Sequence, residues 1–94
     1  MKLLWSNEAL TELSAIMSYI AKDNPTEAET LAEYIYTETE LLLKAYPRTG
    51  RIGRVKNTFE LVIHKSYIVV YSIEKNQVAI QSIRHTARLW PNSF

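Results

Sequence analysis

The chain has 94 residues, of which 47% are hydrophobic and ten are aromatic, and this predicts a single domain over 1–94 with a small core. It contains no cysteine, which excludes disulfide bonds and thiol chemistry, and no apolar run approaches the ~20 residues of a membrane-spanning helix. The N-terminal apolar stretch is also too short for a signal peptide, so we expect a soluble cytoplasmic protein. The net charge is only +1.

The first half of the chain predicts a short strand followed by a helix. Residues 2–5 (KLLW) form the candidate strand, and Ser6 or Asn7 is suited to cap the helix after it. That helix is predicted over 7–22, because apolar residues recur at spacings of three and four at Leu10, Leu13, Ile16, Met17 and Ile20.

A second helix is predicted to begin near Asn24 and to end at about Ala45. Asn24 can cap it, Pro25 suits its first position, and Glu27 stands where a capping box places a carboxylate. The connection between the two helices is very short, so we expect them to pack as an antiparallel hairpin.

The only two glycines, Gly50 and Gly53, lie in YPRTGRIGR and mark the one clear break in the chain. After the break the pattern is typical of strands, and three of them are predicted at 58–64 (TFELVIH), 67–73 (YIVVYSI) and 78–85 (VAIQSIRH). The expected fold class is α+β, with an N-terminal strand and an antiparallel helical hairpin packed on a small antiparallel β-sheet. We expect the sheet face opposite the helices to be only half covered, and function to lie there.

An arginine-rich loop, called the arginine loop below (residues 46–56), follows the second helix. Arg48, Arg51 and Arg54 recur at every third residue with the glycines between them, and Lys56 adds a fourth positive charge. The chain after residue 45 carries a net charge of +6 and the part before it −5, which favours an anionic partner: RNA, DNA or an acidic protein segment. Glycine lets the backbone approach such a partner closely. The alternative is an ordinary surface loop whose arginines pair with acidic residues of the helices.

A second cationic cluster follows the last predicted strand. We expect Arg84, His85 and Arg88 to converge with the arginine loop at one end of the sheet, and Trp90 to pin the tail near them. His85 can act in acid–base chemistry, but a hydrogen-bonding role is favoured because spacing fixes no catalytic partner for it.

Glu60 and His64 share a face of the first strand of the meander. Glu60 is one of two acids in the basic half, so we expect it to neutralise neighbouring arginine or lysine residues, with general-base catalysis as the alternative. Two histidines and no cysteine give no metal-binding spacing, and no phosphate loop, dinucleotide fingerprint or nucleophile elbow occurs. We therefore expect neither a metal nor a cofactor.

Three segments in order resemble the toxins of the RelE/ParE superfamily: LLWSNEALTELSAIMSYIAKDNP, YPRTGRIGRVKNTFELVIHKSYIVVYSI and VAIQSIRHTARLWP. The resemblance covers nearly the whole chain. It implies the strand–helix–helix–sheet fold and the function of a growth-arresting toxin in a bacterial type II toxin–antitoxin module of the plasmid-stabilisation kind. It also implies a cognate antitoxin as partner, in a toxin–antitoxin hetero-oligomer.

The superfamily has two target classes, and the chain is more similar to the ParE-like class. RelE-like members cut messenger RNA on the ribosome with basic residues and a terminal tyrosine or histidine, whereas ParE-like members poison DNA gyrase. No tyrosine follows Tyr71 here, and the ending RHTAR resembles the H-x-A-R finish of ParE-like toxins. Phe59 stands where many relatives carry a basic residue, so no basic contact is assigned to it. The target-binding residues expected for a gyrase-binding toxin are Arg48, Arg51, Arg54, Arg84, His85, Arg88 and Trp90.

Two other functions stay open at this point. A ribosome-dependent endoribonuclease would act on messenger RNA with a cationic site formed by Arg51, Arg54, Lys56, Arg84 and His85. The other function is that of a non-toxic binding module, kept as a partner or repressor component.

Overall fold

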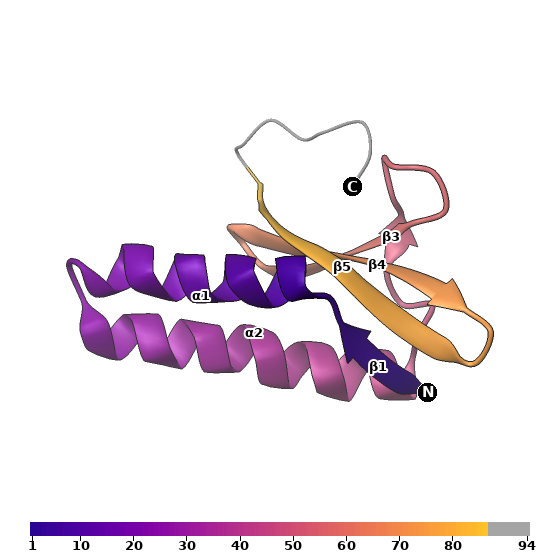
Figure 1. Cartoon of the computed structure of the whole chain (residues 1–94), viewed down its shortest axis with the longest axis horizontal. Helices are drawn as coiled ribbons and strands as arrows, with labels where there is room; N and C mark the ends of the chain where they lie inside the picture. Colours follow the sequence, from indigo (N-terminus) through magenta and orange to yellow (C-terminus); the bar gives the residue numbers. More distant parts are fainter. Residues whose placement is uncertain (87–94) are drawn as a thin grey trace.

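The computed structural model describes residues 1–86, so Arg88 and Trp90 lie outside the described residues. The chain forms a five-stranded sheet with a two-helix hairpin on one face (Figure 1). In chain order the elements are β1 (Lys2–Trp5), α1 (Asn7–Ala21), α2 (Pro25–Ala45), β2 (Arg51–Ile52), β3 (Phe59–His64), β4 (Tyr67–Glu74) and β5 (Gln77–His85). The predicted N-terminal strand, both helices and the three-stranded meander are confirmed; β2 was not predicted.

The sheet is mixed rather than wholly antiparallel. Its order is β1-β5-β4-β3-β2, and neighbouring strands are antiparallel except that β1 runs parallel to β5. This parallel pairing requires a long crossover connection, which the helical hairpin and the meander provide. β1 pairs with β5 only from Gln77 to Ile80, so the rest of β5 extends beyond the end of β1.

Side-chain caps fix where both helices begin. The Ser6 hydroxyl accepts the Ala9 N–H at 3.0 Å and donates to the Gln81 carbonyl at 3.0 Å, so Ser6 rather than Asn7 caps α1. Asn24 Oδ1 accepts the Glu27 N–H at 3.1 Å, as the capping chemistry of the sequence predicts. The Ser6 hydroxyl therefore ties the start of α1 to β5 as well as capping the helix.

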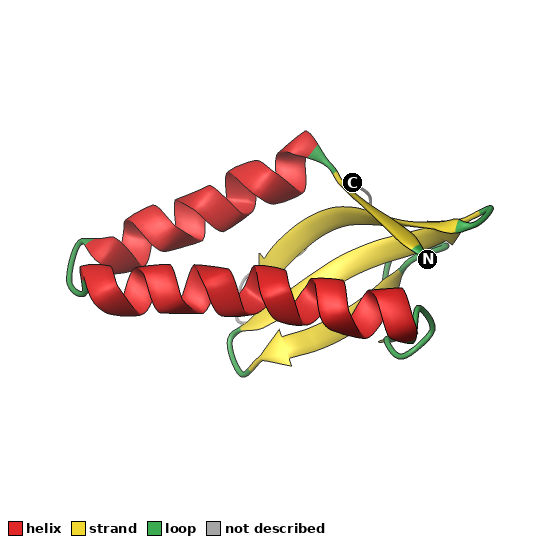
Figure 2. Ribbon diagram, turned by 90° about the horizontal axis from the view of Figure 1, so that it is seen from below, coloured by secondary structure: helices red, strands yellow, loops and turns green. Residues whose placement is uncertain are grey.

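The core lies between the helical hairpin and the sheet. Its fully buried side chains from the two layers are Ala9, Ile35, Leu43, Val69, Tyr71, Val78 and Ile80. At the edge of this core, the Trp5 indole stacks on Tyr36 with ring centres 4.9 Å apart and donates to Glu40 at 2.7 Å, which holds β1 against α2. The turn between the helices projects past the end of the sheet (Figure 2).

The sheet face opposite the helices is more covered than the sequence led us to expect. Ile68 and Val70 alternate with the core residues of β4 and point away from the helices, yet they are 3% and 0% exposed. Glu60 on β3 is also buried on that side, partly by side chains of the arginine loop that bind its carboxylate. Val62, at 53% exposed, is open on this face, so the expectation holds there but fails at the centre.

Candidate functional site

The arginine loop is fixed to the sheet by the buried carboxylate of Glu60. Arg51 is opposite Glu60 in the β2–β3 ladder and donates to Oε1 through Nε at 3.1 Å and Nη2 at 3.0 Å. Arg54 donates to Oε2 through its backbone N–H at 2.8 Å and its Nε at 3.1 Å. The prediction that Glu60 neutralises basic neighbours is confirmed. The alternative in which the loop arginines pair with acids of the helices is wrong for Arg51 and Arg54, because both lie beside Glu60 of β3.

These contacts keep Glu60 ionised. Burial alone would raise the pKa of its carboxyl, but the Arg54 N–H and the guanidinium groups of Arg54 and Arg51 outweigh burial and lower the pKa below its ordinary value. Glu60 is thus committed to the two arginines rather than available as a general base. His64 is separately engaged, since its Nδ1 accepts the Ser66 N–H at 3.1 Å.

The two glycines of the loop allow close approach to the protein's own sheet. The Gly50 N–H donates to the Tyr71 hydroxyl at 3.0 Å, and a Cβ at Gly50 would lie 2.7 Å from that oxygen. A Cβ at Gly53 would overlap the Thr58 hydroxyl, which donates to the Val55 carbonyl at 2.6 Å. Neither glycine has a positive φ, so glycine is required at these positions because no side chain would fit, and not because of the backbone conformation. These contacts within the protein are enough to require glycine at both positions, without the approach of a phosphate or a partner.

Arg48 and Lys56 differ from the two arginines bound to Glu60. Both are exposed, and among residues 1–86 neither forms an ion pair. These two cations of the arginine loop therefore present their charge to solvent, and no carboxylate of residues 1–86 pairs with them.

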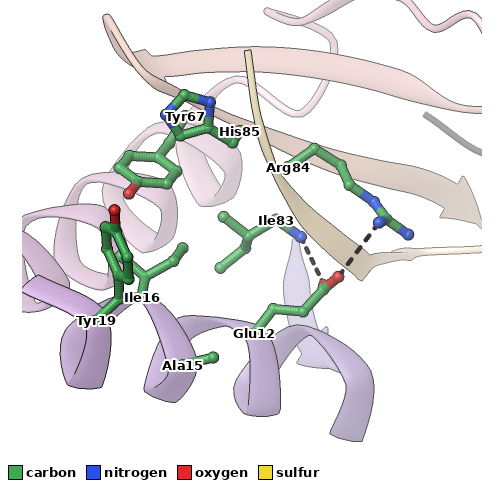
Figure 3. A pocket seen from close by; sticks show the side chains of 8 residues that line it. All are labelled: Glu12, Ala15, Ile16, Tyr19, Tyr67, Ile83, Arg84 and His85. Carbon is green, nitrogen blue, oxygen red and sulfur yellow. Dashed lines mark hydrogen bonds and ion pairs between the residues drawn. The ribbon is translucent and has the colours of Figure 1, made fainter. Parts of the chain in front are cut away.

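The second cationic group lies in a hollow between α1 and the end of β5 (Figure 3). This α1–β5 hollow has a volume of about 320 Å³. It is lined by Glu12, Ala15, Ile16, Tyr19, Tyr67, Ile83, Arg84 and His85. The strand-end residues Arg84 and His85 were predicted as site residues, whereas the α1 residues and Tyr67 were not.

Glu12 links α1 to the edge of β5. Its Oε1 accepts the Ile83 N–H at 2.9 Å and the Ser82 hydroxyl at 3.0 Å, and Arg84 Nη1 lies 3.8 Å from its Oε2. His85 packs edge-on against Tyr67, with ring centres 5.3 Å apart. In Figure 3 the Tyr19 and Tyr67 hydroxyls point toward each other at one end of the hollow, and Glu12 and Arg84 occupy the other end.

The two cationic groups do not form one cluster. Arg51 lies on β2 and Arg84 on β5, and both β3 and β4 run between these strands. Three interstrand steps of about 4.8 Å separate β2 from β5. The expected convergence of the arginine loop with the strand-end cations is therefore wrong for Arg51 and Arg84, while Arg88 and Trp90 lie outside the described residues.

Residues 1–86 contain neither a candidate metal site nor a candidate membrane span. Among residues 1–86, no group of three or more His, Cys, Asp or Glu side chains is placed to hold a metal ion. Within the same part of the chain, no helix combines the length and the apolar character that crossing a membrane requires.

Comparison with known proteins assigns the chain to a protein family. The family described as "ParE toxin of type II toxin-antitoxin system, parDE" matches residues 3–90. The chain belongs to this family. The resemblance to RelE/ParE toxins in the sequence is thereby confirmed, and an antitoxin partner follows from membership of a toxin–antitoxin family.

Two relatives and a solved structure are similar to the chain over most of its length. The chain is 37% identical over 91 residues to "Putative toxin Y4kP" of Sinorhizobium fredii, covering 96% of this chain and 93% of the relative. It is 34% identical over 88 residues to toxin RelE2 of Caulobacter vibrioides, covering 94% of this chain and 98% of the relative. A structure titled "Chromosomal ParDE TA system from P. aeruginosa" shares the fold at 20% identity, with a TM-score of 0.82 over 90% of this chain and 95% of that one.

Proposed function

We propose that this ParE-family toxin arrests growth by binding and poisoning DNA gyrase rather than by cutting a substrate. The observation that carries the proposal is the commitment of Arg51 and Arg54 to Glu60. An RNA-cleaving site would need these cations beside Arg84 and His85, on the far side of two strands. A binding surface needs no such convergence of charges, because separate cations can each contact a large partner.

The antitoxin is proposed to be an acidic or amphipathic protein that lies along the helical hairpin and the sheet. Support comes from the net charge of +6 on the chain after residue 45, since opposite charge on the partner would speed association and neutralise part of this surface. The active toxin and its antitoxin would then form a hetero-oligomer at rest, and gyrase would be poisoned only by free toxin.

A supercoiling assay tests the gyrase proposal. Purified toxin is added to gyrase, ATP and relaxed plasmid, and we expect either loss of supercoiling or accumulation of linear DNA when the gyrase is denatured. An excess of the antitoxin should restore supercoiling. Undisturbed supercoiling at a large excess of folded toxin would count against gyrase as the target.

A second candidate is a ribosome-dependent endoribonuclease. It is favoured by the RelE name of the Caulobacter relative and by the placement of Arg84 and His85 in one hollow. Primer extension on messenger RNA after induction should then show codon-positioned cuts that disappear in Arg84→Ala and His85→Ala. Normal growth on induction without an antitoxin would instead favour the non-toxic binding module.

A further inference from the structure

The segment around β2 forms one outer edge of the sheet and is called the β2 edge below (residues 48–56). β2 is the last strand in the order, so one side of it has no neighbouring strand among residues 1–86. The Gly53 N–H donates to the Thr58 carbonyl at 2.8 Å and closes the turn between β2 and β3. Arg48, Arg51 and Lys56 therefore stand before, within and after the same edge strand.

The β2 edge presents positive charge on a part of the chain that has almost no exposed negative charge. Between Glu40 and Glu74 the sequence contains one acidic residue, Glu60, and this residue is only 3% exposed. The three cations named above are all exposed. A polyanion can thus reach them without meeting an exposed carboxylate of residues 41–73.

Glu60 orders Arg51 without using all of its hydrogen-bond donors. The carboxylate accepts from Nε and Nη2 of Arg51, whereas 56% of that side chain remains exposed. A guanidinium group has five N–H donors in a rigid plane, so the Glu60 contact leaves the donors on Nη1. Because Arg51 is already ordered, an anion that binds it costs less conformational entropy than one that binds a mobile arginine. The planar fork of donors matches phosphate in particular.

The shape of the β2 edge suits a broad partner. Beside Arg48 the surface is open, and it is bordered by Ala45, Tyr46, Pro47 and Thr49. A protein partner gains most of its affinity from side chains that fill pockets. A DNA duplex carries one negative charge per ~1.7 Å of its axis, and separate exposed cations bind it by displacing counterions. An open row of cations therefore favours the phosphate backbone over an acidic protein segment.

We propose that the β2 edge binds the phosphate backbone of double-stranded DNA through Arg48, Arg51 and Lys56, with Arg51 held in place by Glu60. The proposal rests on the proposed function for the source of the DNA: it is the duplex that gyrase holds, and the β2 edge contacts it when the toxin is bound to gyrase. Phosphate contacts carry no sequence information, so binding is independent of sequence. The contact can be measured with the toxin alone.

The first experiment titrates a short fluorescein-labelled DNA duplex with toxin and follows fluorescence anisotropy. With three phosphate contacts, the logarithm of the binding constant should fall against the logarithm of salt concentration with a slope of about −2.7. Affinity should then drop roughly fortyfold between about 50 and about 200 mM salt. A second duplex of unrelated sequence should bind equally, and a glutamate-rich peptide of the same net charge more weakly. No binding to either duplex, or peptide binding as tight as that of the duplexes, would overturn the proposal.

Charge variants locate the contact. Arg48→Gln/Lys56→Gln should weaken binding to the duplex by roughly tenfold and reduce the salt slope to about −0.9, because one of three phosphate contacts remains. Lys2→Gln/Lys22→Gln removes the same charge from the acidic half of the chain and should leave the slope unchanged. Equal losses of affinity and slope in the two double variants would contradict the assignment to the β2 edge.

Glu60 distinguishes an ordered site from an accumulation of positive charge. Glu60→Gln makes the toxin more positive, which by itself would tighten binding, but loss of the carboxylate that orders Arg51 should weaken it by about threefold. Glu74→Gln makes the same change of charge at the exposed end of β4 and should not weaken binding. Tighter binding by folded Glu60→Gln than by the parent would overturn the proposal. If circular dichroism shows that this variant does not fold, the charge variants decide alone.

Failure of this proposal and failure of the gyrase proposal give different results. Toxin that blocks supercoiling but does not bind the duplexes would disprove the DNA contact and leave gyrase as the target. Toxin that binds the duplexes with the expected salt slope but leaves supercoiling undisturbed would disprove gyrase as the target and retain the DNA-binding edge.

Discussion

Glu60 shows how one buried carboxylate can organise a loop that carries three arginines. It is 3% exposed and binds Arg51 and Arg54, whose side chains remain about half exposed. Glu60→Gln keeps the size of the side chain but removes its charge. We expect a loss of about 2 kcal/mol in the free energy of unfolding, below the ~3–5 kcal/mol of fully buried pairs because both arginines stay solvated. Urea denaturation of Glu60→Gln beside Glu74→Gln, an exposed acid at the end of β4, measures the difference.

The same residue predicts a pH dependence of stability. The folded-state pKa of Glu60 is lowered from its ordinary value of 4.5, so its stabilising contribution is complete above the unfolded pKa. It is lost as the pH falls through the folded pKa, when the carboxyl becomes protonated in the native state. Denaturation series from neutral to acidic pH should show a smaller drop in stability for Glu60→Gln than for the parent. Parallel pH profiles would contradict this account of the loop.

Thr39 provides the opposite case, a buried polar group without a hydrogen bond. Its side chain lies at 0% exposure on α2, and within the described residues its hydroxyl has no partner. Thr39→Val keeps the shape and removes the unpaired hydroxyl, so we expect a gain of about 1 kcal/mol in the free energy of unfolding. Thr37→Val, at an exposed position of the same helix, should give no such gain. A loss of stability in Thr39→Val, measured by urea denaturation, would show that the hydroxyl is satisfied.

At the scale of the elements, the two helix caps differ in what they connect. Asn24 serves α2 alone at an exposed position, whereas the Ser6 hydroxyl both caps α1 and donates to the Gln81 carbonyl of β5. Asn24→Ala should cost about 1 kcal/mol, and Ser6→Ala about 2 kcal/mol because a hydrogen bond to the sheet is lost as well. Thermal unfolding of the two variants ranks them, and equal losses would show that the Gln81 contact adds nothing.

The helices and strands that the sequence predicted are those indicated by patterns among residues close together in the chain. The Asn24–Glu27 cap and the apolar spacing of Leu10 to Ile20 depend on neighbouring residues only, and both helices begin and end within about one residue of the prediction. β2 has two residues and no periodicity, so it is defined only by its pairing with Phe59 and Glu60 of β3. The contact of Glu12 with Ile83 joins residues about seventy positions apart, and no spacing in the sequence indicates it.

The sequence named Arg84 and His85 as candidate site residues but did not indicate how they are arranged in space. Arg84 and His85 do line a hollow, but convergence with Arg51 required knowledge of the strand order, which places two strands between them. The sequence did indicate that Glu60 would neutralise cations, since acids are rare in the basic half. Glu12 and Tyr19 are seven residues apart and therefore share a face of α1, but no pattern in the sequence indicates that this face lies against β5.

For the whole molecule, the unequal distribution of charge separates an acidic first half, which holds both helices, from a basic second half. Eight of the ten acidic residues lie before residue 46 and eight of the eleven basic residues after it. Arg51 and Arg54 share the single negative charge of Glu60, whereas the exposed cations Arg48 and Lys56 form no ion pair within residues 1–86. If the loop contacts gyrase, these two side chains should contribute most of its electrostatic attraction.

The double variant Arg48→Gln/Lys56→Gln tests this assignment. We expect the toxin concentration that halves gyrase supercoiling to rise by roughly tenfold, because two exposed charges at a binding surface are lost. The free energy of unfolding should change by less than about 0.5 kcal/mol, since neither side chain forms an ion pair in the described part of the chain. Lys2→Gln/Lys22→Gln removes the same charge from the acidic half and serves as the matched control. Equal potency of the two double variants would show that total charge, rather than the arginine loop, governs binding to gyrase.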